Sequence, residues 1–202
     1  GTDLTYTFNI SSDTTITANF EIAYFYLDPN GVTIRCPLAV VGAIGTVNGV
    51  QYEKVDRNGL LAMRNAGEDL SLVCTSGITS LAQLFRKKGS FNDDISSWDT
   101  SSVTTMERLF ANAKTFNQDI SKWDVSNVTS MFNLLNGANA FNQDISGWDV
   151  SSVTSMRGMF RNTYNFNADI GGWDVSNVKF MKEMLHSSLA FNQDISGWDV
   201  SS

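Results

Sequence analysis

The sequence predicts an α/β, right-handed solenoid built from 25-residue strand–helix coils, preceded by a β-rich N-terminal cap. Three observations predict it: a period of 25 residues, a strand-like apolar spacing in each period, and a helix-like spacing after it. All five tryptophans recur at this interval, at positions 98, 123, 148, 173 and 198. Such self-similarity is typical of repeat proteins, in which each unit buries its apolar side against its neighbours.

The predicted strand lies around each tryptophan. Ile95, Trp98 and Thr100 stand at positions one, four and six of the first regular unit, and position six becomes valine in the later units. This L-x-x-L-x-L spacing is that of a leucine-rich-repeat strand, whose apolar side chains point into the coil. We therefore expect a parallel strand in every repeat.

The predicted helix follows the strand. Met106, Leu109, Phe110 and Ala113 are spaced i, i+3, i+4 and i+7, as on one face of a short helix. Because one unit cannot bury this face alone, we expect columns of equivalent side chains inside the stack. The residues expected to form this repeated core are Trp98, Trp123, Trp148, Trp173, Phe116, Phe141, Phe166, Met131 and Met156.

The chain divides into three predicted parts. Residues 1–20 form a strand pair, interpreted as the tail of an upstream β module or as part of the cap, and residues 21–66 form the β-rich cap with a short helix. Residues 67–202 form the solenoid, with a degenerate first coil over 67–90 and regular repeats from residue 91. No polar cap follows the last strand-like segment, so the array is predicted to be truncated there. This predicts end-to-end self-association through the uncapped C-terminal coil.

Local signals in the N-terminal part are specific. Thr5 to Phe20 alternates apolar and polar residues around a turn at 11–13, which predicts a strand pair. Asn48-Gly49 predicts a hairpin, and residues 56–66 predict a helix that ends at Gly67.

Composition and motifs exclude several function classes. The formal net charge is −7 and the isoelectric point about 4.6, which argues against a nucleic-acid partner. No window approaches eighteen apolar residues, so membrane insertion is not expected. The single histidine, His186, and the absence of a nucleophile–histidine pair or phosphate loop predict that the chain is not an enzyme.

Two columns of aspartates carry the main question about ion binding. They comprise Asp94, Asp119, Asp144 and Asp169, and Asp99, Asp124, Asp149 and Asp174. Three interpretations are open: acceptors for backbone N–H groups in tight turns, calcium ligands, or a negative surface strip. The spacing matches no EF-hand or calcium β-roll, so no cofactor is expected, with calcium as the alternative. A column of asparagines, which includes Asn92 and Asn117, predicts a ladder of side-chain amides.

Residues that differ between repeats are the candidates for partner binding, because the constant residues are explained by the stack. They are Phe132, Arg157, Arg161, Tyr164, Phe180 and Lys182. The alternative is that they only form a solvated surface.

The segment FNQDISGWDVSSVTSM, residues 141–156, resembles the repeats of BspA-like bacterial surface proteins. The resemblance implies an extracellular location, on the bacterial cell surface or secreted, and adhesion to an unknown protein or glycan. A passive stalk that holds a distant domain away from the cell is the alternative. In an exported protein the only cysteines, Cys36 and Cys74, are expected to form one disulfide, and two buried free thiols are the alternative.

Overall fold

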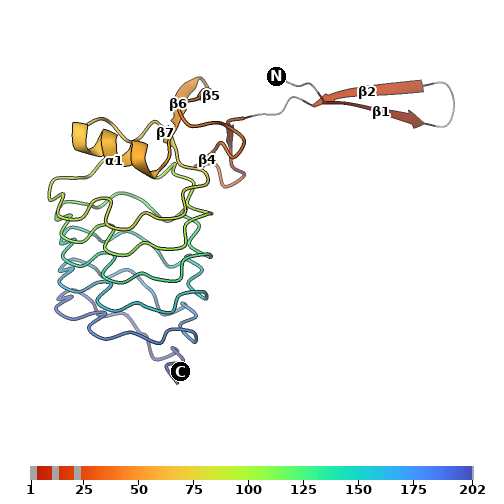
Figure 1. The fold of residues 1–202 in the computed structure, drawn as a ribbon. Coiled ribbons are helices and arrows are strands. Elements are labelled where there is room, and N and C mark those ends of the chain that lie inside the picture. Colours follow the sequence, from red (N-terminus) through yellow and green to blue (C-terminus); the bar gives the residue numbers. More distant parts are fainter. Residues whose placement is uncertain (1–3, 11–13, 21–23, 202) are drawn as a thin grey trace.

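The computed structural model describes residues 4–10, 14–20 and 24–201 (Figure 1). Its helix and strands are β1 (Leu4–Ile10), β2 (Thr14–Phe20), β3 (Tyr26–Leu27), β4 (Ile34–Arg35), β5 (Ile44–Val47), β6 (Val50–Lys54), α1 (Arg57–Ala66) and β7 (Val73–Cys74). Strands β1 and β2 pair antiparallel, with Leu4 opposite Phe20. The turn predicted at 11–13 lies outside the described residues.

A small sheet joins the N-terminal part to the repeats. Strands β5 and β6 form the predicted hairpin, in which Asn48 and Gly49 have φ values of 51° and 83°. Both central residues have positive φ, as a two-residue primed turn requires. Strand β6 also pairs in parallel with β7, which lies at the start of the repeat region.

Helix α1 ends where the sequence predicts, before Gly67, but begins one residue later than predicted because Asp56 is its N-cap. Asp56 at the N-cap accepts a hydrogen bond from the Gly59 N–H at 2.8 Å, and Gly67 ends the helix with a φ of 75°. Leu60 is fully buried and packs into the main core.

Helix α1 also covers backbone groups at the first end of the repeats. Arg57 donates through Nη2 to the Ala82 carbonyl at 2.7 Å, and Arg64 donates through Nη1 to the Leu84 carbonyl. In the last repeat the corresponding carbonyl of Lys182 accepts from a backbone N–H of the preceding repeat instead. The two arginines therefore replace the hydrogen bonds that a preceding repeat would supply.

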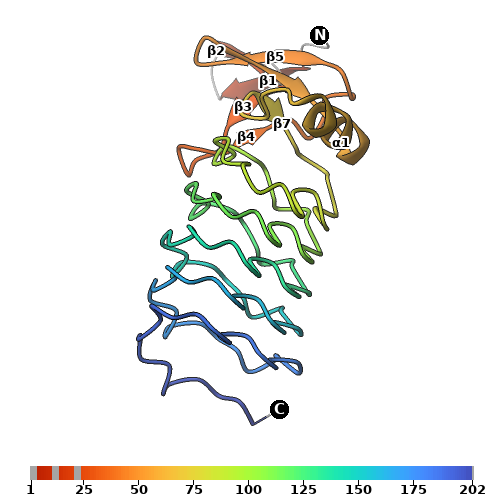
Figure 2. The same ribbon diagram turned by 90° about the vertical axis from the view of Figure 1, so that its left-hand side faces the viewer.

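The predicted strand–helix solenoid is wrong. Strand β7 ends at Cys74, and the described residues 75–201 contain no helix and no strand of more than one bridge residue. Figures 1 and 2 show this region as stacked layers of irregular chain, which we call the repeat layers. Single parallel bridges link them at residues 80, 105, 130, 155 and 180. Because the strand–helix unit is absent from these residues, the predicted α/β class and the predicted likeness to leucine-rich repeats are also wrong.

Two consecutive β-turns occupy the place of each predicted helix. In one layer the Leu109 N–H donates to the Met106 carbonyl and the Ala113 N–H donates to the Phe110 carbonyl. The third residue of each such turn has a positive φ, which interrupts a right-handed helix. These third residues are Gln83, Lys87, Arg108, Asn112, Asn133, Gly137, Gly158, Asn162, Glu183 and Ser187. Because corners one and four of two successive turns also fall at i, i+3, i+4 and i+7, the apolar spacing fits both structures.

The predicted strand is likewise a pair of turns. The Trp123 N–H donates to the Ile120 carbonyl at 3.1 Å, and the Val128 N–H donates to the Val125 carbonyl at 2.9 Å. The apolar residues again occupy the corners and point inward.

The predicted core residues are all buried, although the backbone that carries them differs from the prediction. Equivalent rings stack from layer to layer: Trp98 on Trp123 with centroids 6.2 Å apart, and Phe116 on Phe141 at 5.9 Å. The buried set is Trp98, Trp123, Trp148, Trp173, Phe116, Phe141, Phe166, Met131 and Met156.

The predicted disulfide between Cys36 and Cys74 is present, and both cysteines are fully buried. It ties the segment after β4 to β7, and so fastens the N-terminal part to the first layer. The backbone N–H of Cys36 also donates to Ser76 Oγ at 2.9 Å.

Candidate functional site

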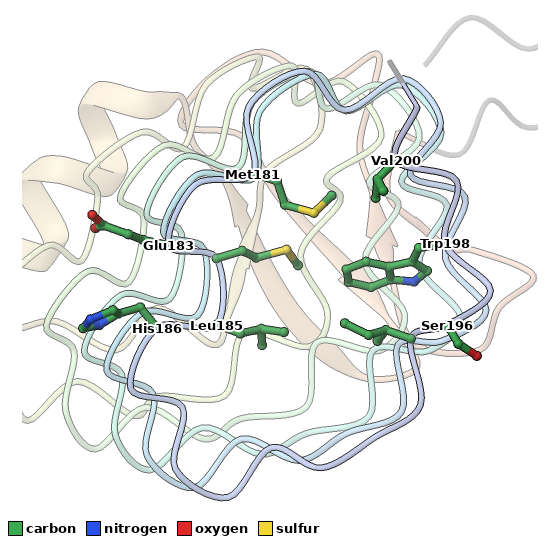
Figure 3. A pocket seen from close by; sticks show the side chains of 9 residues that line it. Met181, Glu183, Leu185, His186, Ser196, Trp198 and Val200 are labelled. Atoms are coloured by element: carbon green, nitrogen blue, oxygen red, sulfur yellow. The ribbon is translucent and has the colours of Figure 1, made fainter.

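Each repeat layer has two opposite outward sides, which Figure 3 shows along the stack. Glu183 and His186 lie on one side, and Ser196 lies on the other. The double-turn side carries the paired turns and comprises residues 79–90, 104–115, 129–140, 154–165 and 179–190. The Asp side carries the aspartates and comprises residues 91–103, 116–128, 141–153, 166–178 and 191–201.

On the double-turn side, backbone groups join one layer to the next. Every second N–H donates to a carbonyl 24 residues ahead, as from Arg108 to Phe132 at 2.8 Å and from Phe110 to Leu134 at 2.9 Å. The middle two residues of each turn are exposed or half-exposed, except Ala111, Gly137 and Gly158. The backbone bonds between layers do not involve their side chains, several of which, such as Lys87 and Lys182, are exposed.

Three of the predicted partner-binding residues share one column on this side. Phe132, Arg157 and Lys182 occupy the second position of the first turn in successive layers. The Arg108 guanidinium lies 4.5 Å from the centroid of the Phe132 ring, and that of Arg157 lies 5.9 Å from it. Arg108 therefore joins the candidates through its contact with Phe132.

The other predicted residues lie nearby in the later layers. Arg161 pairs through Nη1 with Glu183 Oε2 at 3.0 Å. Tyr164 and Phe180 are 43% and 61% exposed, although they are large apolar side chains.

Charge is divided between the two sides. The double-turn side carries nine Lys or Arg residues against two Glu, a formal charge of +7. The Asp side carries eleven Asp residues against Lys122, a formal charge of −10. A chain of net negative charge therefore presents one positive side.

The aspartates of both columns accept hydrogen bonds from the backbone N–H two residues ahead, as the turn interpretation expects. The Asp144 carboxylate accepts from the Ser146 N–H at 2.9 Å. The Asp149 carboxylate accepts from both the N–H and the hydroxyl of Ser151, at 3.1 and 2.6 Å. The other predicted positions, Asp94, Asp99, Asp119, Asp124, Asp169 and Asp174, accept in the same way.

These turn bonds lower the pKa of several carboxyls. The Ser146 N–H lowers the pKa of Asp144, and the Ser151 hydroxyl and N–H lower that of Asp149. The neighbouring charge of Asp174 raises the pKa of Asp149, but the hydrogen bonds outweigh it. The turns thus offset the like-charge repulsion within each column.

No group of three or more His, Cys, Asp or Glu side chains that could hold a metal ion occurs among the described residues. The carboxylates repeat along the stack as single turn acceptors and do not converge on a common point.

Side chains, rather than backbone groups, link neighbouring layers along the Asp side. The Asn142 N–H donates to Asn117 Oδ1 at 2.9 Å, and the same bond recurs along the predicted asparagine ladder. Each tryptophan donates through Nε1 to a carbonyl of the preceding layer, as Trp148 does to Ile120 at 3.0 Å.

Asp99 differs from the other aspartates because it is buried. Its carboxylate accepts from Arg35 Nη1 at 3.2 Å and from the Ser76 hydroxyl. Arg35 also pairs with Asp28. Nearby, Lys54 donates through Nζ to the Ser76 carbonyl, and burial lowers the pKa of this lysine while Asp99 opposes that shift. Arg35 thus pairs with two aspartates and Lys54 with a backbone carbonyl, and these contacts fasten the N-terminal part to the first layers.

A pocket lies on the end layer and is lined by Met181, Leu185, Ile195, Trp198 and Val200, among others (Figure 3). The equivalent residues of the preceding layer, which include Met156, Ile170 and Trp173, are buried. The pocket is thus lined by positions that are interior in the preceding layer.

The sequence matches the family described as Mycoplasma protein of unknown function, DUF285, over residues 58–162 and again over residues 119–202. The chain belongs to this family. The match covers every repeat layer of the DUF285 chain and begins within α1. No curated protein and no solved structure matches the chain. Within the described residues, no helix is long and apolar enough to span a bilayer.

Proposed function

We propose that this DUF285 chain is a non-catalytic binding module that acts outside the cell, on a bacterial surface or in secreted form. The observation that carries the proposal is that constant and variable residues have different places in each layer. Most residues that repeat are engaged in stacking and turns, whereas many of those that vary, such as Phe132, Arg157 and Lys182, project from the double-turn side. Variable side chains on a rigid scaffold are a common arrangement for recognition.

Two further observations support an extracellular role. The Cys36–Cys74 disulfide is of a kind that persists in oxidising compartments. The likeness of residues 141–156 to BspA-like surface proteins belongs to the same proposal, with an extracellular protein or glycan as the partner. The proposed function requires no cofactor, so melting temperatures in EDTA and in millimolar calcium are expected to agree.

The purified chain tests the proposal on a glycan array and on a panel of immobilised secreted proteins. A variant with Phe132→Ala, Tyr164→Ala and Phe180→Ala is expected to lose the binding that the wild type shows. Lys122→Ala with Ser146→Ala is the control, because both residues are exposed on the Asp side. Equal binding by both variants would favour a passive stalk.

The open end layer provides a second route to association. Val200 is 65% exposed and, with Leu185 and Trp198, lines the end pocket. We expect self-association to increase with concentration in light scattering and to weaken with Val200→Asp. A strict monomer at high concentration would contradict association through this layer.

A further inference from the structure

We infer that the double-turn side binds an extended acidic polysaccharide, one that carries sulfate or carboxylate groups along its chain. This inference rests on the proposed binding function and names its partner. It begins from the charge of +7 on this side, against −10 on the Asp side of the same layers. An anionic chain is attracted to the double-turn side and repelled by the Asp side, so the charges decide which side of the stack it contacts.

The cations of this side are available to a partner. Among the described residues, no ion pair involves Lys87, Arg108, Arg157 or Lys182. The two acids of the side are already engaged: Glu183 pairs with Arg161, and Glu107 accepts from the Ser130 hydroxyl at 2.8 Å. The local field is thus dominated by unpaired positive charge.

The spacing of these cations suits a chain of sugars. Bridged layers are separated by about 4.8 Å, so the five layers of the double-turn side extend over about 20 Å. Cations occur in the first, second, fourth and fifth of these layers, with none in the third. Such sparse charge matches one acidic group per one or two sugars better than duplex DNA, which carries one charge per ~1.7 Å.

One aromatic ring of this side lies between two cations, and two more are exposed in the following layers. Phe132 occupies the uncharged third layer, between the guanidinium groups of Arg108 and Arg157. Tyr164 and Phe180 are exposed in the following layers, three residues after Arg161 and two residues before Lys182 in the sequence. Rings of this kind pack against the C–H faces of sugars while neighbouring cations bind their acidic groups. Tyr164 and Phe180 offer such faces, whereas Phe132 holds the guanidinium groups of Arg108 and Arg157 on this side.

An anionic membrane fits this surface less well than a single chain does. A membrane presents a broad field that acts on the whole protein, whose net charge is −7. A single polysaccharide chain contacts only the positive side and avoids the repulsion from the Asp columns.

The test measures binding of the full chain to heparin and to hyaluronate, with neutral dextran, phosphatidylserine vesicles and single-stranded DNA as comparison ligands. We expect binding to at least one acidic polysaccharide, weakened by salt, and none to dextran. Lys182→Gln should weaken it about two- to fivefold, and the triple variant Arg108→Gln, Arg157→Gln, Lys182→Gln at least tenfold. Lys122→Gln removes one exposed lysine from the Asp side and should leave binding unchanged.

Several results would overturn the inference. They are no binding to either polysaccharide at low salt, equal losses in Lys122→Gln and Lys182→Gln, or tighter binding to vesicles or DNA than to both polysaccharides. The proposed function fails separately, if the wild type binds nothing on the arrays or the aromatic variant binds as the wild type does. If the wild type binds a neutral ligand and the aromatic variant does not, the binding module is supported. The acidic polysaccharide is then rejected as its partner. Circular dichroism of each variant confirms that it is folded.

Discussion

The two sides of each layer are held to their neighbours by different groups. On the double-turn side, backbone N–H groups donate to backbone carbonyls of the next layer, whatever the side chains are. On the Asp side, the indole of tryptophan, the amide of asparagine and the amide of glutamine make the contacts between layers. The difference teaches where sequence is constrained. Columns repeat where side chains perform the stacking and vary where the backbone does.

The largest expected effect is at the centre of the side-chain contacts. Trp148→Ala removes a buried ring stacked on Trp173 and the bond from Nε1 to Ile120. It should lower the free energy of unfolding by about 3–5 kcal/mol, measured by urea denaturation. Trp148→Phe keeps much of the packing and should cost less. An alanine variant as stable as the wild type would contradict the dependence of this side on its side chains.

The next effect concerns the N-terminal end, where a covalent bond supplements both kinds of contact. The disulfide closes a loop with a sequence separation of 38 residues. Its removal in Cys36→Ala with Cys74→Ala should cost about 3–4 kcal/mol in the chain-entropy model. Thermal melts with and without a reductant provide the same comparison in the wild type. Equal melting temperatures would show that the noncovalent junction suffices.

A direct comparison of the sides uses two exposed residues. Asn142→Ala removes the acceptor of the Asn167 N–H, a bond of 2.7 Å, and should cost about 1 kcal/mol. Arg157→Ala removes a larger side chain from the double-turn side and should stay within about 0.5 kcal/mol of the wild type. Equal losses in urea denaturation would remove the distinction between the sides.

The smallest effect is the pH dependence of the aspartate turns. Because folding lowers the pKa of Asp144 and Asp149, their contribution is present above the unfolded pKa of about 3.9 and is lost as pH falls through the folded value. Asp149→Asn keeps a neutral acceptor but removes the charge. The wild type should therefore melt at a higher temperature than the variant at pH 6, and this difference should shrink as pH falls through the folded pKa. A constant difference would contradict the pKa shift.

The sequence identified what depends on side-chain identity. The period, the buried columns, the asparagine ladder, the end of α1 at Gly67 and the disulfide were all predicted from residue types at fixed positions, and the aspartate turns were one of three interpretations. The backbone between them was not, since Met106, Leu109, Phe110 and Ala113 satisfy both a helix and two turns. Asparagine or glycine at positions such as 133 and 137 was the available signal for positive φ.

The candidate site was predicted only in part. Phe132, Arg157 and Lys182 were recognised as variable, but their common column and the contact of Arg108 with Phe132 depend on how the turns are stacked. The charge of each side was also missed. The charge of a side can be counted only after the residues of each repeat have been assigned to one side or the other.

The hydrogen bonds between layers connect residues 24 to 28 positions apart, and they recur in every layer. A duplicated 25-residue unit therefore carries all the donors and acceptors that bond it to the layers on either side. When a unit is removed, the two layers that it separated have matching donors and acceptors. Genes for such proteins can gain or lose repeats without redesign of the rest. Each gain would lengthen the binding surface by one layer, about 4.8 Å, so the reach of the module can evolve in fixed steps.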